Sequence, residues 1–555
     1  MNKQWWHNKI AYQIYPKSFY DSNGDGIGDI GGIRSKLGYL ARLGIDILWI
    51  SPMYTSPLAD EGYDIADYYS IDPRFGTMEE MDLLIEEARA AGISILMDLV
   101  VNHTSDEHRY FLDVKTHPES PYKDWYILRK KNADGSLPTN WRSYFGGSVW
   151  EELGYDDLYY LHMFHKKQPD LNWENKDVRE AVYKNINFWL DKGLGGFRID
   201  AIINIKKPEI YKDYTPDRKD GLASGFKMLE DATGIGIFLN EMKEKCFLPH
   251  NAFTVGEVFN IEKKDVPDFI GPDGYFNSMF DFSSAIEGQS EKGWYDYKEV
   301  GPQNYKKAVF TSQKTVGDTG FLSNIIENHD EPRGVSHYLP TADLCEKSKK
   351  LLATLFFFLR GIPFIYQGQE IGMENISYSD PSQISDISAQ NEYQLALDAG
   401  YSVKDALEIV SRYSRDNSRT PMQWTDKPNA GFTTGTPWLF VNENYKDINV
   451  SEQESRSDSV LAYYKAMIRL RKDPDLSDLF TYGDFSPFME NEDLLMAYTR
   501  TFKDRQVLIA GNFSHEEKVL SLPGAARLLL ANDSITLNED RITLKPFDAA
   551  VIIFN

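Results

Sequence analysis

Arg198 and Asp200 stand two positions apart in an otherwise apolar run. If this run is a strand, both side chains point to the same face. A core strand does not normally bury an arginine and a carboxylate together unless they serve a function. Two further apolar runs also end in carboxylates, Glu257 and Asp330. Three carboxylates at the carboxyl ends of three strands predict an active site at the top of a barrel of parallel strands.

Asp200 and Glu257 are the residue types that hydrolysis of a glycosidic bond requires. One carboxyl group protonates the leaving oxygen, and the other attacks the anomeric carbon or activates water. Arg198 shares a strand face with Asp200 and is expected to keep that carboxylate ionised, which suits a nucleophile. Glu257 follows the apolar residues Phe253 and Val255, where partial desolvation is expected to raise its pKa, as an acid requires. Three unrelated salt bridges at strand ends are the disfavoured alternative.

His103 and His329 each follow an asparagine, Asn102 and Asn328, at the end of a predicted strand. A single histidine at such a position is usually structural. Two Asn-His pairs at the top of one barrel are better explained as hydrogen-bond partners of sugar hydroxyl groups. Aromatic residues make up 14% of the chain, including 33 Tyr and 11 Trp, which fits a protein that stacks sugar rings.

The segment DSNGDGIGD alternates oxygen-bearing side chains with small residues. Four of these side chains and one main-chain carbonyl can converge on a hard cation. The five candidate ligands are Asp21, Asn23, Asp25, Asp29 and, through its carbonyl, Ile27. Gly32 stands where an EF-hand would carry its last glutamate, so the loop is not an EF-hand. An Asx-rich turn without metal is the alternative.

These residues must be positioned by strands that alternate with helices. Helix-like runs cover residues 32–43, 77–91 and 177–192, and Thr77 with Glu80 forms a predicted capping box at the start of the second run. Strand-like runs begin near residues 11, 46, 93, 197, 252, 276, 321 and 363, and the first is expected to cover residues 11–19. Alternating strands and helices favour a parallel sheet, and eight strands predict a closed (β/α)8 TIM barrel.

Two segments interrupt the alternation of strands and helices, and a different pattern follows it at the C-terminal end. Residues 1–103 are predicted to form its first part, and residues 104–172, rich in Tyr, Trp, Asn, Gly and Pro, an inserted domain after strand 3. Residues 173–481 complete the barrel, with a polar excursion near residues 372–444. Residues 482–555 carry short alternating strands, which predict a C-terminal antiparallel β domain.

The composition of the chain excludes some classes of partner and indicates the cellular compartment. The 555-residue chain has a formal net charge of −24, which argues against nucleic acid and anionic membrane as partners. Only two cysteines, Cys246 and Cys345, occur, so a reducing compartment is favoured. The first residues carry no signal-peptide-like run, and no stretch of about 18 apolar residues predicts a membrane span. We expect a monomer that is cytoplasmic; a mature form whose signal has been removed is the alternative.

The strand-end motifs resemble the four signature regions of the α-amylase superfamily. These motifs are residues 98–103 (DLVVNH), 196–200 (GFRID), 256–257 (GE) and 327–330 (ENHD). Residues 168–172 (QPDLN) are similar to a fifth region as it stands in the oligo-1,6-glucosidase subfamily. The resemblance covers nearly the whole chain, from Trp5 through residues 415–424 (RDNSRTPMQW).

The resemblance implies a role for each matching residue. Asp200 would be the nucleophile, Glu257 the acid/base, and Asp330 a third carboxylate that grips the hydroxyl groups next to the reacting carbon. The other implied substrate-binding residues are Asp60, Tyr63, His103, Phe145, Phe164, Arg198, Ala201, His329 and Arg415. Glu61 departs from the asparagine common at its position. The resemblance also implies a structural Ca²⁺ or Mg²⁺ in the DSNGDGIGD loop, and no organic cofactor.

Ala201, directly after Asp200, is the residue most informative about linkage. In the family this position tends to be valine in isomaltase-like members and smaller or polar in maltase-like members. The alternative for Ala201 is simple core packing. Val258 and Phe259, which follow the acid/base, are further candidates for the same subsite.

We therefore expect a retaining exo-α-glucosidase that releases α-glucose from the non-reducing end of short α-glucosides, with α-1,4 linkages favoured over α-1,6. Its partner is a small oligosaccharide substrate. An oligo-1,6-glucosidase, a trehalose-6-phosphate hydrolase and a sucrose isomerase are the alternatives. The acidic balance disfavours binding of a phosphorylated sugar, and an arginine-rich loop expected before Asn328 in sucrose isomerases is absent. A non-catalytic transporter-associated subunit is excluded by the three carboxylates, which such proteins lose.

Overall fold

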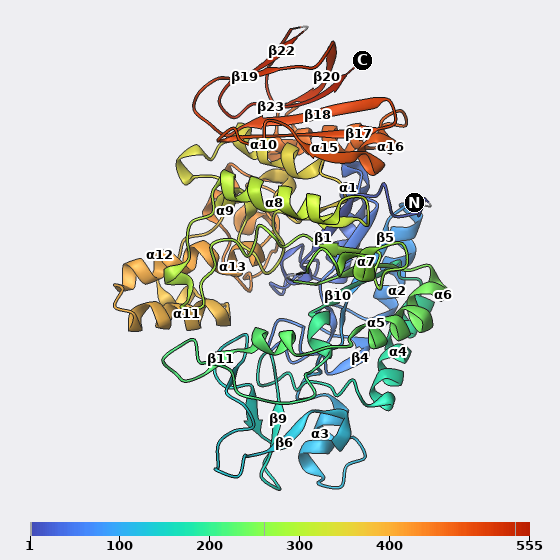
Figure 1. Ribbon diagram of the computed structural model, residues 1–555, viewed down its shortest axis with the longest axis vertical. Helices are drawn as coiled ribbons and strands as arrows, with labels where there is room; N and C mark the ends of the chain where they lie inside the picture. Colours follow the sequence, from blue (N-terminus) through green and yellow to red (C-terminus); the bar gives the residue numbers. More distant parts are fainter. Residues whose placement is uncertain (1–2, 260, 539, 555) are drawn as a thin grey trace.

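Eight parallel strands form a closed barrel in the computed structural model, which describes residues 3–259, 261–538 and 540–554. All eight predicted strand positions are confirmed. The strands are β1 (Ala11–Ile14), β2 (Ile47–Ile50), β5 (Ser94–Val100), β10 (Gly196–Asp200), β12 (Phe253–Gly256), β13 (Ser278–Phe280), β14 (Leu322–Asn324) and β15 (Ile362–Tyr366). Their order around the barrel follows the chain, and β15 closes it on β1. The barrel strands occupy the middle of the molecule (Figure 1).

The predicted helices are present, with small changes at their ends. They are α1 (Ile30–Leu43), α2 (Met78–Ala90) and α4 (Lys176–Asp191). Thr77 and Glu80 form the predicted capping box at the start of α2. The first strand is shorter than predicted because Pro16, which has no amide hydrogen to donate, opens a 3-10 turn (Pro16–Ser18) after it. Further helices around the barrel are α8 (Pro302–Val316), α10 (Glu346–Phe357), α15 (Val460–Arg471) and α16 (Ser477–Tyr482).

The inserted domain follows β5 and lies at the lower end of the molecule in Figure 1. It contains α3 (Arg109–Thr116), β6 (Leu128–Lys130), β7 (Trp141–Arg142), β8 (Trp150–Glu152) and β9 (Leu158–Leu161). A later segment joins it, because β11 (Ala223–Ser224) pairs with β7. Trp141 also stacks on Tyr211 and Tyr214, with ring centroids 5.3 and 6.0 Å apart.

The polar excursion contains a helix pair, α11 (Ile387–Asp398) and α12 (Val403–Tyr413), and the short helix α13 (Asp416–Arg419). The pair projects from the left side of the molecule in Figure 1. An apolar cluster that includes Ile376, Ala389 and Val410 supports it.

The C-terminal β domain is antiparallel, as predicted. One sheet contains β16 (Asp484–Pro487), β17 (Leu495–Phe502), β18 (Arg505–Asn512), β23 (Ala549–Phe554) and β20 (Ala526–Ala531). The other contains β19 (Lys518–Ser521), β22 (Arg541–Leu544) and β21 (Thr536–Leu537). Within the described residues, no helix combines the length and apolarity needed to cross a membrane.

Candidate active site

Arg198 joins three carboxylates that come from three neighbouring strands. Its side chain is 1% exposed, and strand register places it directly opposite Asp98. Nη1 lies 2.5 Å from Asp98 Oδ1 and 2.7 Å from Asp200 Oδ1. Nη2 lies 2.8 Å from Glu257 Oε1. The two predicted catalytic carboxylates are therefore held by one guanidinium group at the floor of the site.

The sequence predicted an ionised Asp200, whereas the unliganded site favours its protonated form. Burial raises the pKa of Asp200 well above its usual range; the Arg198 guanidinium opposes this shift, and the nearby carboxylates reinforce it. Glu257 Oε1 is bound by the same guanidinium, and its Oε2 accepts a hydrogen bond of 2.7 Å from the Ala201 backbone amide. The difference for Asp200 arises chiefly because its side chain is buried. In addition, Arg198, which was expected to serve this carboxylate alone, also binds Asp98 and Glu257.

Asp330 lies in a strongly cationic environment. It was expected at the end of a strand, but β14 ends at Asn324 and Asp330 lies in the loop that follows it. Its carboxylate is 2.7 Å from Arg419 Nη2, 3.5 Å from Arg415 Nη1 and 3.0 Å from His329 Nε2. Burial raises the pKa of Asp330, but the His329 ring and the two arginines outweigh burial and hold it well below its usual range. Asp330 is therefore ionised and can accept hydrogen bonds from sugar hydroxyl groups.

One side of the site contains a stacked ring pair and an acidic side chain. The rings of Tyr63 and His329 are parallel within 10°, with centroids 5.4 Å apart, and Tyr63 Oη lies 2.6 Å from His329 Nε2. Arg415 Nη1 lies 3.7 Å from Asp60 Oδ1. Burial raises the pKa of Asp60 to about 7.

His103 is held as a neutral ring near Asp60. Its Nε2 lies 3.1 Å from Gln168 Nε2, and Gln168 also donates a hydrogen bond of 3.0 Å to Asp60 Oδ2. Burial lowers the pKa of His103 to about 4, so the ring is uncharged at neutral pH. A neutral imidazole can donate one hydrogen bond to a sugar without attracting an anion.

These residues surround a cavity of about 310 Å³, which we call the inner cavity. The sequence-predicted residues that line it are Asp60, Tyr63, His103, Phe145, Phe164, Asp200, Ala201, Glu257, Asp330 and Arg415. Arg198 and His329 lie beneath the lining and contact it through Asp200 and Asp330. Glu61 points elsewhere and pairs with Lys17 at 2.6 Å. Phe259 lines the inner cavity, whereas Val258 packs in the core.

Sequence reasoning missed several residues of the site. Asp98 and Gln168 were part of quoted motifs without being assigned a role, and Arg419 stands four positions after Arg415. Residues four apart on a helix share a face, so the RDNSR motif carried a signal for Arg419. Glu331 and the aromatic residues Tyr144, Phe226, Phe282 and Trp294 also line the inner cavity. Nothing in the local sequence distinguished them from surface or core residues.

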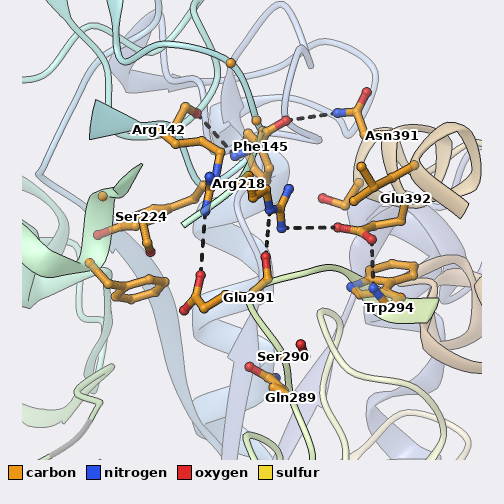
Figure 2. Close-up of a pocket in the computed structure, with 18 of the residues that line it drawn as sticks. Arg142, Phe145, Arg218, Ser224, Gln289, Ser290, Glu291, Trp294, Asn391 and Glu392 are labelled. Carbon is orange, nitrogen blue, oxygen red and sulfur yellow. Dashed lines mark hydrogen bonds and ion pairs between the residues drawn. The ribbon is translucent and has the colours of Figure 1, made fainter. Parts of the chain in front are cut away.

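A second cavity of about 710 Å³, the outer cavity, adjoins the inner one. The residues that line both cavities are Tyr144, Phe145, Phe226, Trp294 and Ser388. Segments distant in sequence are linked across it, as Figure 2 shows: Asn391 donates a hydrogen bond of 2.9 Å to the Phe145 carbonyl, and the Trp294 amide donates one of 2.8 Å to Glu392. A substrate longer than one sugar would extend into this space.

The arginines of the outer cavity are already paired with carboxylates. Arg142 lies 2.6 Å from Asp217 and 3.6 Å from Glu291. Arg218 lies 4.0 Å from Glu392 and also binds the Glu291 carbonyl (Figure 2). The charge of these arginines is thus neutralised by the protein, and the cavity offers little net attraction to an anion.

The DSNGDGIGD loop has the oxygen-only donor set that Ca²⁺ prefers, but its side chains are engaged in turns. Asp21 accepts hydrogen bonds from the amides of Asn23, Gly24 and Gly26, and from Thr433 Oγ1. Asp29 caps α1 by accepting from the Gly32 amide. In the described part of the chain, no three His, Cys, Asp or Glu side chains converge as metal ligands do. A metal here remains a prediction, and a cation would have to compete with the amide donors.

Chelation is expected to lower the melting temperature more than the initial rate. A bound cation would tie the loop after β1 to the Thr433 segment, and a ligand of the native state stabilises it by mass action. The measurement compares melting temperature and initial rate with EDTA, with EDTA plus excess Ca²⁺, and in buffer alone. An unchanged melting temperature would favour the metal-free Asx turn, and loss of rate alone would contradict a structural role.

An eight-stranded barrel in which one arginine binds the carboxylates of Asp98, Asp200 and Glu257 defines a glycoside hydrolase of the α-amylase type. The chain belongs to the α-amylase family: the model of the alpha amylase catalytic domain matches residues 13–479, and that of the alpha-amylase SusG C-terminal domain matches residues 495–551. Both expectations, the family and a glycosidase activity, are confirmed.

Relatives along the full chain differ in what they act on. An oligo-1,6-glucosidase of Bacillus cereus is 40% identical over 99% of each chain. The structure of a trehalose-6-phosphate hydrolase from Bacillus licheniformis is 39% identical, with a TM-score of 0.91 and coverage of 99% of this chain and 100% of that one. An isomaltulose synthase from Protaminobacter rubrum is 35% identical, with a TM-score of 0.93 and complete coverage of both chains.

Proposed function

We propose that this chain is a retaining, exo-acting α-glucosidase that removes single glucose units from short α-glucosides. The observation that carries the proposal is the shared guanidinium of Arg198, which holds together Asp200 and Glu257 in the lining of the inner cavity. Retaining glycosidases need a close pair of carboxyl groups. We propose that the part of the cavity around Asp60 and Arg415 accommodates one sugar, which leads to release of a terminal unit.

The proposed reaction uses the three carboxylates in separate roles. Glu257 gives a proton to the leaving oxygen while Asp200 forms a covalent bond to the anomeric carbon. Asp330, ionised beside its arginines, grips the neighbouring hydroxyl groups. Water, deprotonated by Glu257, then releases α-glucose. The unliganded site favours a proton on Asp200. Before the first step, Asp200 must lose this proton and Glu257 must carry one.

The α-1,4 preference expected from Ala201 finds no support among the relatives, and we propose α-1,6-linked oligosaccharides as the main substrates. The full-length relative named an oligo-1,6-glucosidase supports this choice. Ala201 lines the inner cavity beside Asp200 and leaves space near the leaving sugar. We therefore expect α-1,4 substrates to be accepted as well.

Trehalose 6-phosphate is the second candidate substrate, because a hydrolase of that sugar is among the structural relatives. Its phosphate would have to bind in the outer cavity, beyond the scissile bond. Arg142 and Arg218 are the cations of that lining, and both are paired with carboxylates. Binding a dianion would require these pairs to break, which disfavours this substrate. For sucrose isomerisation, the segment from Trp294 to Lys298 is aromatic and contains no arginine, where an arginine-rich loop is expected.

The substrate test is glucose release from isomaltose, maltose, trehalose 6-phosphate and sucrose at equal concentration. We expect the highest kcat/KM for isomaltose, a lower value for maltose and negligible values for the other two. A kcat/KM for trehalose 6-phosphate above that for isomaltose would overturn the substrate assignment. Formation of isomaltulose in place of free glucose from sucrose would favour the isomerase.

Replacing Ala201 by Val is expected to raise the ratio of isomaltose to maltose hydrolysis. Two added methyl groups would crowd an α-1,4-linked ring, whereas the flexible arm of an α-1,6 linkage can avoid them. One or two methyl groups in a pocket change specificity by roughly 10- to 200-fold. The measurement is kcat/KM for both disaccharides in the wild type and the variant.

The Ala201→Val variant needs a control for backbone strain. Ala201 has a positive φ of 43°, where a β-branched residue is strained, so the melting temperature of the variant must be measured alongside. Ala201→Gly removes the methyl group without adding strain and should leave the ratio unchanged or lower it. Equal losses on both disaccharides in Ala201→Val would mean that strain, not crowding of the subsite, dominates.

A further inference from the structure

Glu331 is a fourth carboxyl group in the inner cavity, and the mechanism above leaves it without a role. It follows Asp330 directly, is partly exposed and lines the inner cavity together with Glu257 and Trp294. The charged groups that act on it are the carboxylates of Asp330 and Glu257. Among the residues that the structure describes, no cation and no hydrogen-bond donor offsets this repulsion. An acidic side chain in such a place requires an explanation.

The position of Glu331 relates it to the leaving sugar and not to the glucose that reacts. Asp60 and Arg415 lie 3.7 Å apart in the lining of the inner cavity, and the proposed mechanism places the reacting glucose beside them. Glu257, the proposed proton donor to the leaving oxygen, also lines this cavity. Glu331 lines it together with Trp294, which lines the outer cavity as well. We therefore place Glu331 on the side of the inner cavity that faces the outer one.

We propose that Glu331 is a specificity-determining residue whose carboxyl group hydrogen-bonds a hydroxyl group of the leaving sugar. This inference rests on the proposed α-glucosidase function and names the contact that selects the second sugar unit of its substrate. The bound hydroxyl group supplies the partner that the protein itself does not provide for Glu331.

Protonation of Glu331 makes this contact dependent on pH. Burial, reinforced by Asp330 and Glu257, raises the pKa of Glu331 to about 8. Its other titratable neighbours, Tyr297 and Tyr338, are uncharged at neutral pH because burial raises the pKa of each phenol. Below the pKa the carboxylic acid donates one hydrogen bond and accepts others, and above it the carboxylate only accepts. The proposed contact is the one that the carboxylic acid donates to a hydroxyl oxygen of the leaving sugar. Ionisation removes this donor, so affinity for the leaving sugar should fall as the pH rises through about 8.

Two substrates with the same reacting glucose separate this contact from the rest of the site. Isomaltose has a leaving sugar, whereas in α-glucosyl fluoride the leaving group is a fluoride ion. Glu331→Ala should lower kcat/KM for isomaltose by roughly three- to tenfold, the value of one neutral hydrogen bond, and leave that for α-glucosyl fluoride unchanged. Glu331→Gln, which also donates and accepts, should retain most of the isomaltose activity at neutral pH.

The pH profile of kcat/KM for isomaltose, measured from pH 6 to pH 9.5 in the wild type and in Glu331→Gln, tests protonation of Glu331, because titration of the catalytic carboxyl groups is common to both enzymes. The ratio of the wild-type value to the Glu331→Gln value should fall as the pH rises through about 8. Glu299→Gln is the matched control: Glu299 is 79% exposed, pairs with Arg412 and lies outside both cavity linings, so this variant should behave as wild type.

Two results would overturn the inference: an unchanged isomaltose value in Glu331→Ala, or equal losses on both substrates in Glu331→Ala and Glu331→Gln at wild-type melting temperature. If Glu331→Ala has a lower melting temperature, its loss of activity can reflect instability. The Glu331→Gln variant and the pH profile then test the inference. A wild-type enzyme that does not release α-glucose from α-glucosyl fluoride would instead contradict the α-glucosidase function itself. The failures of the two proposals are thus distinguishable.

Discussion

Replacing Asp200 by Asn is expected to abolish hydrolysis of isomaltose, with a loss in kcat of roughly four to six orders of magnitude, as for other catalytic nucleophiles. The amide has the volume of the carboxylate and can keep an oxygen facing Arg198, so the floor of the site survives. Because burial raises the pKa of Asp200, its ionised form costs folding free energy at neutral pH. An amide removes that cost, and the melting temperature should stay equal or rise.

The control is Asp191→Asn, the same chemical change on a side chain that is 73% exposed, which should keep full activity. A second test of the mechanism is stereochemical. NMR, recorded before mutarotation, identifies the anomer of glucose that the wild type releases first. Initial α-glucose supports double displacement through Asp200. Initial β-glucose, or near-normal turnover by Asp200→Asn, would end the nucleophile assignment.

The barrel could be predicted because each of its elements leaves a local signal. Eight apolar runs marked eight strands, and the capping box of Thr77 and Glu80 marked the start of a helix. The later segment that joins the inserted domain, Tyr211 to β11, could not be predicted in the same way. It contacts Trp141 through Tyr211 and Tyr214 and pairs with β7 through β11, and no periodic pattern in either segment indicates the other.

In the site, too, residues with a local sequence signal could be predicted, and contacts that depend on the fold could not. Residues at strand ends were found because an isolated charge in an apolar run is conspicuous. The sharing of Arg198 was not found, since it depends on strand register, which brings Asp98 and Glu257 to the same guanidinium. Protonation follows from that geometry, so it too lay beyond the motifs. The paired arginines of the outer cavity likewise come from segments that meet only in the fold.

Replacing Glu257 by Gln should separate the two halves of the reaction. The variant cannot protonate a sugar leaving group, and general acid catalysis contributes roughly 10²- to 10⁴-fold, so kcat/KM for isomaltose should fall by that factor. Fluoride leaves as an anion without a proton, so α-glucosyl fluoride should still react with Asp200. The Gln side chain keeps an oxygen that can accept from the Ala201 amide, which preserves the local backbone.

The second half-reaction in Glu257→Gln lacks its base, so the glucosyl group should remain on Asp200. Mass spectrometry of the intact protein after α-glucosyl fluoride should show one added glucosyl unit, and peptide analysis should place it on Asp200. Azide, which attacks without giving up a proton, should displace the carboxylate and yield α-glucosyl azide. The double variant Asp200→Asn with Glu257→Gln should form no adduct. Equal losses on isomaltose and the fluoride, with no adduct and no response to azide, would contradict the acid/base role. The two variants together thus test whether the carboxylates that share Arg198 divide one displacement into two steps.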